Sequence, residues 1–230
     1  MFYFDYTYLI FVVPAMILAM WAQASVQSTF KKFSRVLSSR GMTGYDAARR
    51  ILDENGLSNV LVNRVAGNLT DHFDPKTNTV NLSESVYDSA SVAAIGVAAH
   101  EAGHAVQYEV GYTPMKIRGA IIPVTQFGSR LAFPLVLIGI ILSYPPLAYI
   151  GCIFFGTVTF FQLVTLPVEF NASRRALASI ENSGILNREE INGSKKVLTA
   201  AAMTYVAALA VSVGQLLRLL ILVGGGRRRD

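Results

Sequence analysis

Two histidines and a glutamate are spaced for metal-dependent hydrolysis in the segment His100-Glu101-Ala102-Gly103-His104. Residues four apart lie on one face of a helix, so the imidazoles of His100 and His104 can bind one Zn²⁺. Glu101 lies beside His100, and its carboxylate can approach the metal-bound water without binding the metal. Zinc lowers the pKa of such a water to about 7, and a carboxylate can take its proton as the water attacks a peptide carbonyl. The pattern predicts zinc-dependent peptide hydrolysis with Glu101 as the base and proton shuttle.

The H-E-x-x-H pattern also occurs by chance in unrelated helices, so the surrounding residues matter. Residues 90–99, which precede the motif, are almost all small or apolar and predict a buried helix over residues 90–108. A buried cluster of two histidines and a glutamate costs free energy unless a metal or polar partners compensate it. The setting therefore favours a metal site that holds one Zn²⁺ per chain.

A catalytic zinc usually has three protein ligands and a water, so a third ligand is expected. Several acidic or histidine side chains lie near the motif in sequence: His72, Glu84, Asp88 and Glu109. Glu109 is five residues past His104 and therefore points about 140° away from the ligand face of the helix. We favour Glu169, because a carboxylate at the membrane edge of an apolar segment is costly and usually has a functional role. The alternative is an interfacial carboxylate that pairs with Arg174 or Arg175.

The composition of the chain indicates a membrane protein. Of the 230 residues 52% are hydrophobic and 15% are charged, where a soluble domain carries about 25% charged residues. This excludes a disordered chain, and a single Cys excludes a disulfide-rich scaffold. The apolar residues gather over residues 3–25, 119–142, 144–166 and 200–223, each long enough to span a bilayer, which needs about 20 residues in a helix. The first segment could be a signal peptide, but it lacks a positive n-region and a clear cleavage site.

We therefore predict a mainly α-helical integral membrane protein with about four transmembrane helices and divide it into six parts. These are an N-terminal transmembrane helix (1–26), a catalytic region (27–118), a transmembrane helical hairpin (119–166), a third-ligand helix with a polar region (167–199), a C-terminal transmembrane or re-entrant helix (200–223) and a basic tail (224–230). The turn Ser143-Tyr144-Pro145-Pro146 closes the hairpin. Both polar regions then face the same side, and Glu169 returns to the side of the histidines.

The distribution of Lys and Arg predicts the orientation in the bilayer. The first polar region, residues 27–118, holds ten of them, the second, residues 167–199, holds five, and none precedes the first span. The positive-inside rule places both regions in the cytoplasm and the N-terminus outside. Arg227, Arg228 and Arg229 contradict this orientation if the last segment spans fully. The net charge of +5 reflects this bias, and no basic stripe with interleaved aromatics indicates nucleic acid as a partner.

The first polar region predicts mixed α and β structure. Residues 31–40 predict a short basic helix that continues the first span. Thr43 is a good N-cap for a helix over residues 44–55, and strands are expected over residues 59–65, 68–73 and 77–82. Segment 77–82 is a candidate edge strand that pairs with an extended peptide substrate. A further helix is expected to begin after Pro167 and to run over residues 168–179.

The segment Glu169-Phe170-Asn171-Ala172-Ser173-Arg174-Arg175-Ala176 resembles the E-F-x-A-D-R-x-A segment of the gluzincin membrane proteases. These include the CAAX prenyl endopeptidases and the heat-shock protease of bacterial inner membranes. The order of features resembles more closely the bacterial membrane neutral zinc metallopeptidases, often called YugP-type. In them an N-terminal span, a D-H-[FY]-D-P segment (here residues 71–75), H-E-x-G-H, an apolar hairpin and V-E-F-x-A-S-R-R-A (here residues 168–176) follow in this order. The resemblance covers nearly the whole chain.

This resemblance implies a zincin-like core, with the active-site helix packed on a small β-sheet, and Glu169 as the third zinc ligand. Ser173 stands where the broader gluzincins carry an aspartate that orients a ligand histidine. Serine does this only weakly, so Asn171 or another group is expected to help. Arg174 and Arg175 are interpreted as cations on the helix surface or at lipid headgroups, and the alternative is that one of them pairs with a carboxylate near the zinc.

Two other residues are weaker site candidates. His72 belongs to the D-H-[FY]-D-P segment and is a candidate for contact with substrate, although a surface turn held by Asp71 and Asp74 is the favoured interpretation. Tyr205 can donate to an oxyanion, but an interfacial tyrosine of the last span is the favoured interpretation.

The sequence as a whole predicts a membrane-embedded zinc metalloendopeptidase whose substrates are membrane-associated or unfolded polypeptides. The alternative is a non-catalytic membrane scaffold or adaptor that retains a structural zinc. A zinc transporter is less favoured, because its ligands would lie at the bilayer midplane and the histidines here lie outside the spans. The oligomeric state is left open.

Overall fold

The computed structural model describes residues 6–225, which form two compact units. The first, here called the helical unit, comprises residues 1–23, 116–167 and 204–230, of which the first five and last five are outside the described residues. The second, here called the α/β unit, comprises residues 24–115 and 168–203. The basic tail predicted for residues 224–230 lies outside the described residues from position 226 onward.

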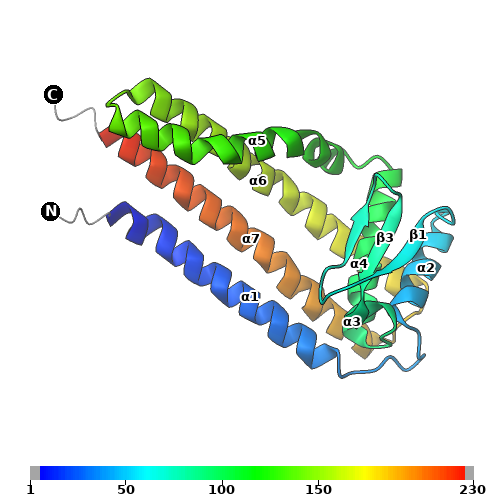
Figure 1. The fold of residues 1–230 in the computed structure, drawn as a ribbon. Coiled ribbons are helices and arrows are strands. Elements are labelled where there is room, and N and C mark those ends of the chain that lie inside the picture. Colours follow the sequence, from blue (N-terminus) through cyan, green and yellow to red (C-terminus); the bar gives the residue numbers. More distant parts are fainter. Residues whose placement is uncertain (1–5, 226–230) are drawn as a thin grey trace. The chain divides into compact units, whose positions relative to one another are not determined.

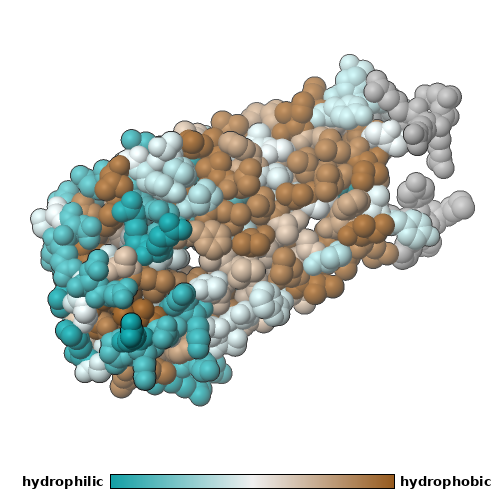
Figure 2. All heavy atoms as spheres, turned by 180° about the vertical axis from the view of Figure 1, so that it is seen from behind, coloured by the Kyte–Doolittle hydropathy of each residue, from teal (hydrophilic) through white to brown (hydrophobic). Residues whose placement is uncertain are grey.

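Four long helices carry most of the apolar residues (Figure 1). A π-helical turn, η1 (Tyr8–Val12), leads into α1 (Val13–Phe33), and the others are α5 (Thr113–Ile141), α6 (Pro145–Asn182) and α7 (Arg188–Gly225). All four are long and apolar enough to cross a membrane. On the face shown in Figure 2, hydrophobic residues cover most of the surface of these helices. The prediction of a mainly helical membrane protein with four spans is confirmed.

Small residues let α5 and α6 pack closely as an antiparallel hairpin. A Cβ added at Gly139 would lie 2.5 Å from the backbone nitrogen of Ala148, and one at Gly151 would lie 2.7 Å from the carbonyl oxygen of Ala132. Such close backbone approach is the usual way in which helices associate in lipid. Ser143 turns the chain with a positive φ of 50° between the two helices. The predicted hairpin is present.

Two helix boundaries differ from the prediction. The expected new helix after Pro167 is wrong, because α6 runs without interruption from Pro145 to Asn182 and contains Pro167 in its interior. Long membrane helices tolerate proline, since neighbouring groups satisfy the freed backbone carbonyl. The expected helical continuation over residues 31–40 is also wrong, because α1 ends at Phe33. Lys31 and Lys32 occupy its last turn, where the helix dipole favours positive charge.

The α/β unit begins with helix α2 (Gly44–Glu54), whose start matches the predicted cap. The Thr43 hydroxyl accepts from the Asp46 amide, and the Asp46 carboxylate accepts from the Thr43 amide in a capping box. Strands β1 (Leu61–Val65), β2 (His72–Asp74) and β3 (Thr79–Ser83) follow. A short helix, α3 (Glu84–Tyr87), leads from β3 toward α4 (Val92–Glu109).

The three strands form a sheet in the order β1–β3–β2, with β1 parallel and β2 antiparallel to β3. The prediction that segment 77–82 forms an edge strand is therefore wrong, because β3 is the central strand. Val80 and Leu82 of β3 are fully buried, as expected for a strand with neighbours on both sides. The outer strands are β1 and β2, and β2 lies against α4.

Helix α4 forms the centre of the α/β unit (Figure 1). Its N-cap is Ser91, whose hydroxyl accepts from the Ala94 amide at 3.2 Å. Helix α2, strands β2 and β3, and the parts of α6 and α7 in this unit pack around it, and they bury nearly every side chain from Val92 to Gln107. The expected packing of this helix on a small sheet is confirmed.

Candidate metal centre

Glycines on α4 let the helices that carry the site approach each other. A Cβ at Gly103 would lie 2.9 Å from the carbonyl oxygen of Ala172 on α6, closer than a side-chain carbon normally approaches an oxygen. At Gly96 a Cβ would lie 3.1 Å from the side chain of Ser194 on α7, whose hydroxyl donates to the Val92 carbonyl at 2.8 Å. The glycine inside the H-E-x-G-H motif therefore sets the distance between α4 and the segment of α6 that contains Glu169.

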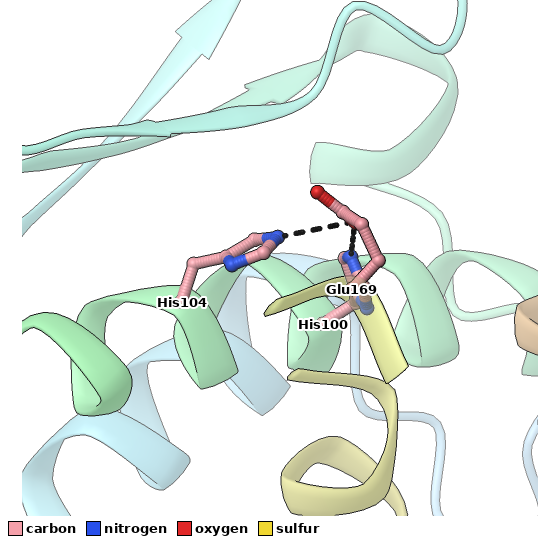
Figure 3. Close-up of side chains that lie close together, drawn as sticks. All are labelled: His100, His104 and Glu169. Carbon is pink, nitrogen blue, oxygen red and sulfur yellow. Dashed lines mark hydrogen bonds and ion pairs between the residues drawn. The ribbon is translucent and has the colours of Figure 1, made fainter. Parts of the chain in front are cut away.

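This close packing brings His100, His104 and Glu169 together (Figure 3). Glu169 lies 69 residues after His100 and 65 residues after His104 in the sequence. Nε2 of His100 lies 3.2 Å and Nε2 of His104 lies 3.6 Å from Oε2 of Glu169. Glu169 is 2% exposed and His104 is 7% exposed. A buried carboxylate thus faces two imidazole nitrogens on the adjacent helix.

Ser173 contacts the first histidine from one turn further along α6. Its Oγ lies 3.2 Å from Nδ1 of His100. A hydroxyl can accept from Nδ1–H, which leaves Nε2 directed at Glu169 and available to a metal. Ser173 is thus the partner of His100 at the position where the resemblance predicted a weakened contact.

Gln107 contacts the second histidine, and the sequence had not indicated it. Its Oε1 lies 2.9 Å from Nδ1 of His104, and its Nε2 donates to the carbonyl oxygen of Val168 at 2.8 Å. The same nitrogen donates to Oδ1 of Asn171 at 2.9 Å. Gln107 is fully buried, so one amide joins a site histidine to the stretch of α6 on either side of Glu169.

The charges of Glu101 and Glu169 shift the pKa values of neighbouring groups. Burial lowers the pKa of His104, but its hydrogen bond to Glu169 and the charges of Glu101 and Glu169 outweigh burial and raise that pKa above its usual range. Burial raises the pKa of Asp71, against hydrogen bonds from Ser83, and the charge of Glu101 adds to the rise. Glu101 is itself 8% exposed. Its negative charge therefore acts on both His104 and Asp71, the residue before β2.

Comparison with known proteins identifies a family. A family model described as "Putative neutral zinc metallopeptidase" matches residues 8–224. The chain belongs to this zinc metallopeptidase family. It is also 49% identical over 215 residues to "Putative membrane protease YugP" of Bacillus subtilis (strain 168), a match that covers 94% of this chain and 96% of the relative. No solved structure matches it.

The side chains that converge here fit the zinc that the family implies. Two imidazole nitrogens and a carboxylate oxygen are the donors that catalytic zinc prefers. With metal–ligand bonds of about 2.0–2.1 Å, the donor atoms of a tetrahedral site lie about 3.3 Å apart. The separations of 3.2 Å and 3.6 Å between the Glu169 oxygen and the two nitrogens are close to this value. All three residues offer donor atoms within 4.8 Å of one another.

The other candidate site residues lie in different surroundings. His72 is exposed on β2, where Nδ1 donates to the Thr70 carbonyl at 2.9 Å and Nε2 lies 3.2 Å from the Asn81 amide nitrogen. Arg174 is exposed on α6, whereas Arg175 donates to Asn171 at 2.9 Å. Tyr205 belongs to the helical unit. The functional roles suggested for His72, Arg174 and Tyr205 stay predictions.

Proposed function

We propose that this protein is a zinc-dependent endopeptidase that is embedded in the membrane and hydrolyses peptide bonds with a zinc-activated water. The convergence of His100, His104 and Glu169, with Glu101 adjoining His100 on the same helix, carries the proposal. These are the three ligands and the base that zinc-dependent peptide hydrolysis requires.

Each side chain of the site has one task. His100, His104 and Glu169 would hold one Zn²⁺, which when bound would acidify a water and polarise the substrate carbonyl. Glu101 accepts the proton of the attacking water and then donates it to the leaving amine. Ser173 orients His100 by hydrogen bonding. Gly103 has no side chain, which lets α6 approach α4 closely enough for Glu169 to face the histidines. Because Glu101 is almost fully buried, water competes little for its carboxylate.

The outer strand β2 supports binding of an extended substrate. It lies against α4, and as an outer strand it has one side that no other strand of the sheet occupies. A peptide that adds to such an edge is held by main-chain hydrogen bonds, which do not depend on its sequence. This supports membrane-associated or unfolded polypeptides as the substrates. The lysine and arginine distribution supports a cytoplasmic location of the α/β unit. The similarity to the Bacillus subtilis protein supports a bacterial plasma membrane as the location.

The experiment is cleavage of an unfolded polypeptide by the purified full chain in detergent. Glu101→Gln should abolish cleavage while it leaves the zinc content unchanged. Glu109→Gln is the matched control, because Glu109 lies exposed on the same helix. Equal cleavage by wild type and Glu101→Gln would refute the mechanism. Metal analysis of His100→Ala and Glu169→Ala tests the ligands, and full zinc in Glu169→Ala would refute the third-ligand assignment.

The alternative function is a membrane scaffold that retains a structural zinc. It differs from the protease in one measurable respect. A scaffold would hold a full complement of zinc and hydrolyse no peptide bond under any of these conditions. The burial of Glu101 beside a metal site favours the protease, because a structural site has no need of a buried carboxylate that does not bind the metal.

A further inference from the structure

A chain of hydrogen bonds runs from His104 to an arginine on the neighbouring helix. His104 contacts Gln107 at 2.9 Å, Gln107 donates to Asn171 at 2.9 Å, and Arg175 donates to the same Asn171 oxygen at 2.9 Å. Asn171 and Arg175 lie on α6, one turn apart, and the two other members lie on α4. All four belong to the α/β unit.

The chemistry of each member determines the orientation of the next. The guanidinium of Arg175 can only donate hydrogen bonds, so Asn171 must present its Oδ1 to it. The same oxygen then faces Gln107, which must present its NH₂ group. The backbone carbonyl of Val168, 2.8 Å from the same nitrogen, can only accept and imposes the same orientation. If the Gln107 amide were rotated by 180°, its oxygen would face the Val168 carbonyl oxygen and the Asn171 Oδ1, and neither hydrogen bond could form.

The orientation of Gln107 in turn determines the tautomer of His104. With its NH₂ group directed at Asn171 and Val168, Gln107 presents Oε1 to Nδ1 of His104. An amide oxygen only accepts, so Nδ1 must carry a proton. Nε2, which faces Glu169, is then the nitrogen whose proton a bound metal would displace. This is the tautomer that binds a metal through Nε2.

We infer that Gln107, Asn171 and Arg175 are positioning residues that hold His104 in its metal-binding tautomer. The inference rests on the proposed zinc site. Here neutral amides and a remote arginine replace the carboxylate that often accepts from a ligand histidine. Gln107 also holds the backbone of α6 next to Glu169 through Val168, so one side chain orients one ligand and locates the helix of another.

The experiment measures zinc affinity by competition with a chelator in the purified full chain, together with the exchange of the histidine Nδ1 proton. The chain has three histidines, so ¹⁵N-histidine labelling gives a simple spectrum in which His72 is the reference. Gln107→Met should weaken zinc binding by about 10- to 100-fold and speed exchange of the His104 proton. Arg175→Met should act in the same direction, by about tenfold. Arg188→Met, at an exposed arginine of the same unit, is the matched control and should resemble wild type.

A second substitution separates orientation from packing. Aspartate at position 171 accepts from Gln107 whichever way it is turned, so it does not need Arg175 to orient it. Asn171→Asp should therefore restore zinc affinity and slow proton exchange in the Arg175→Met background. Wild-type affinity in Arg175→Met, or no recovery on adding Asn171→Asp, would overturn the inference. If Gln107→Met does not fold, the Arg175 variants still decide the question, because Arg175 is only partly buried.

The same measurements distinguish this inference from the proposed function. Neither zinc affinity nor proton exchange involves peptide cleavage. A wild-type protein that binds zinc, shows the slow His104 proton and cleaves no peptide would refute the protease and support the positioning role. A protein that cleaves peptides with unchanged zinc affinity in Gln107→Met would support the protease and refute the positioning role.

Discussion

The hydroxyl oxygen of Ser173 lies 3.2 Å from Nδ1 of His100, on the side of the ring opposite the nitrogen that faces Glu169. A hydroxyl both donates and accepts, so this contact stabilises the metal-binding tautomer of His100 without enforcing it. His104 differs, because its amide partner presents an oxygen that only accepts. The tautomer of His104 is therefore more tightly constrained by its partner than the tautomer of His100.

This difference predicts the effect of substitutions at Ser173. Ser173→Ala should weaken zinc binding by about tenfold, the lower end of the range for loss of such a partner. Ser173→Asp should bind zinc at least as tightly as wild type, because a carboxylate accepts more strongly from Nδ1–H. Chelator competition measures both, with Ser179→Ala on the same helix as the control. Tighter binding in Ser173→Ala than in Ser173→Asp would contradict the assignment.

The close contact between Gly103 and Ala172 predicts that even a methyl group disrupts the site. A Cβ at Gly103 would lie 2.9 Å from a backbone oxygen, which cannot rotate away as a side chain can. Gly103→Ala should push α6 from α4 and separate Glu169 from the histidines. Because a 1 Å misplacement can reduce activity on the order of 100-fold, kcat/KM for peptide cleavage should fall by about that factor.

The matched control for Gly103→Ala is Gly156→Ala on α6, where an added Cβ meets no heavy atom within 4 Å. It should retain zinc and activity, and it should be slightly more stable, since alanine favours a helix over glycine by about 1 kcal/mol. Retention of full zinc affinity and activity in Gly103→Ala would show that the approach of the two helices does not position Glu169.

Asp71 predicts a pH dependence of stability. Its carboxylate accepts from the amide and hydroxyl of Ser83, but burial and the charge of Glu101 raise its pKa above the ordinary value of 3.8. The folded state therefore binds this proton more tightly than the unfolded state. The stability that it contributes is complete below pH 3.8 and is lost as the pH rises through the raised pKa.

Asp71→Asn removes this titration and keeps an oxygen for Ser83. Its melting temperature relative to wild type, both metal-free in detergent, should therefore increase as the pH rises above 3.8. Asp74→Asn is the control of opposite sign, because the hydrogen bonds from Lys76 and Thr77 lower the pKa of Asp74. Wild type should gain stability over that variant as the pH rises. The same slope for both variants would contradict the assigned environment of Asp71.

Local signals in the sequence predicted much of this fold. The apolar segments predicted the four spanning helices, and Thr43 predicted the start of α2. Strand order was not predictable in the same way. β3 pairs in parallel with β1, 18 residues earlier, and the alternation of a short strand does not indicate which neighbours it has. The helix boundary predicted at Pro167 was wrong, because a proline that usually ends a helix is tolerated inside a long membrane helix.

The sequence predicted those residues of the candidate site that belong to recognisable motifs. His100, Glu101 and His104 share a spacing that has a chemical reason, and Glu169 followed from an unexplained carboxylate and from the resemblance. Gln107 has no such signal, since one glutamine on a helix is ordinary in sequence. Its significance comes from partners 61 and 64 residues away, which only the packing of α4 on α6 reveals.

Removal of the metal should lower the stability of the α/β unit. Zinc would join α4 to α6 through His100, His104 and Glu169, whose donor atoms lie within 4.8 Å of one another. A ligand that binds only the folded state stabilises it by about 2.7 kcal/mol when present at 100 times its Kd. Wild type should therefore melt at a lower temperature with chelator than with zinc, and Glu169→Gln should show a smaller difference. Glu181→Gln, exposed on the same helix, should behave like wild type. An equal zinc-dependent shift in Glu169→Gln and wild type would mean that Glu169 contributes nothing to the metal site.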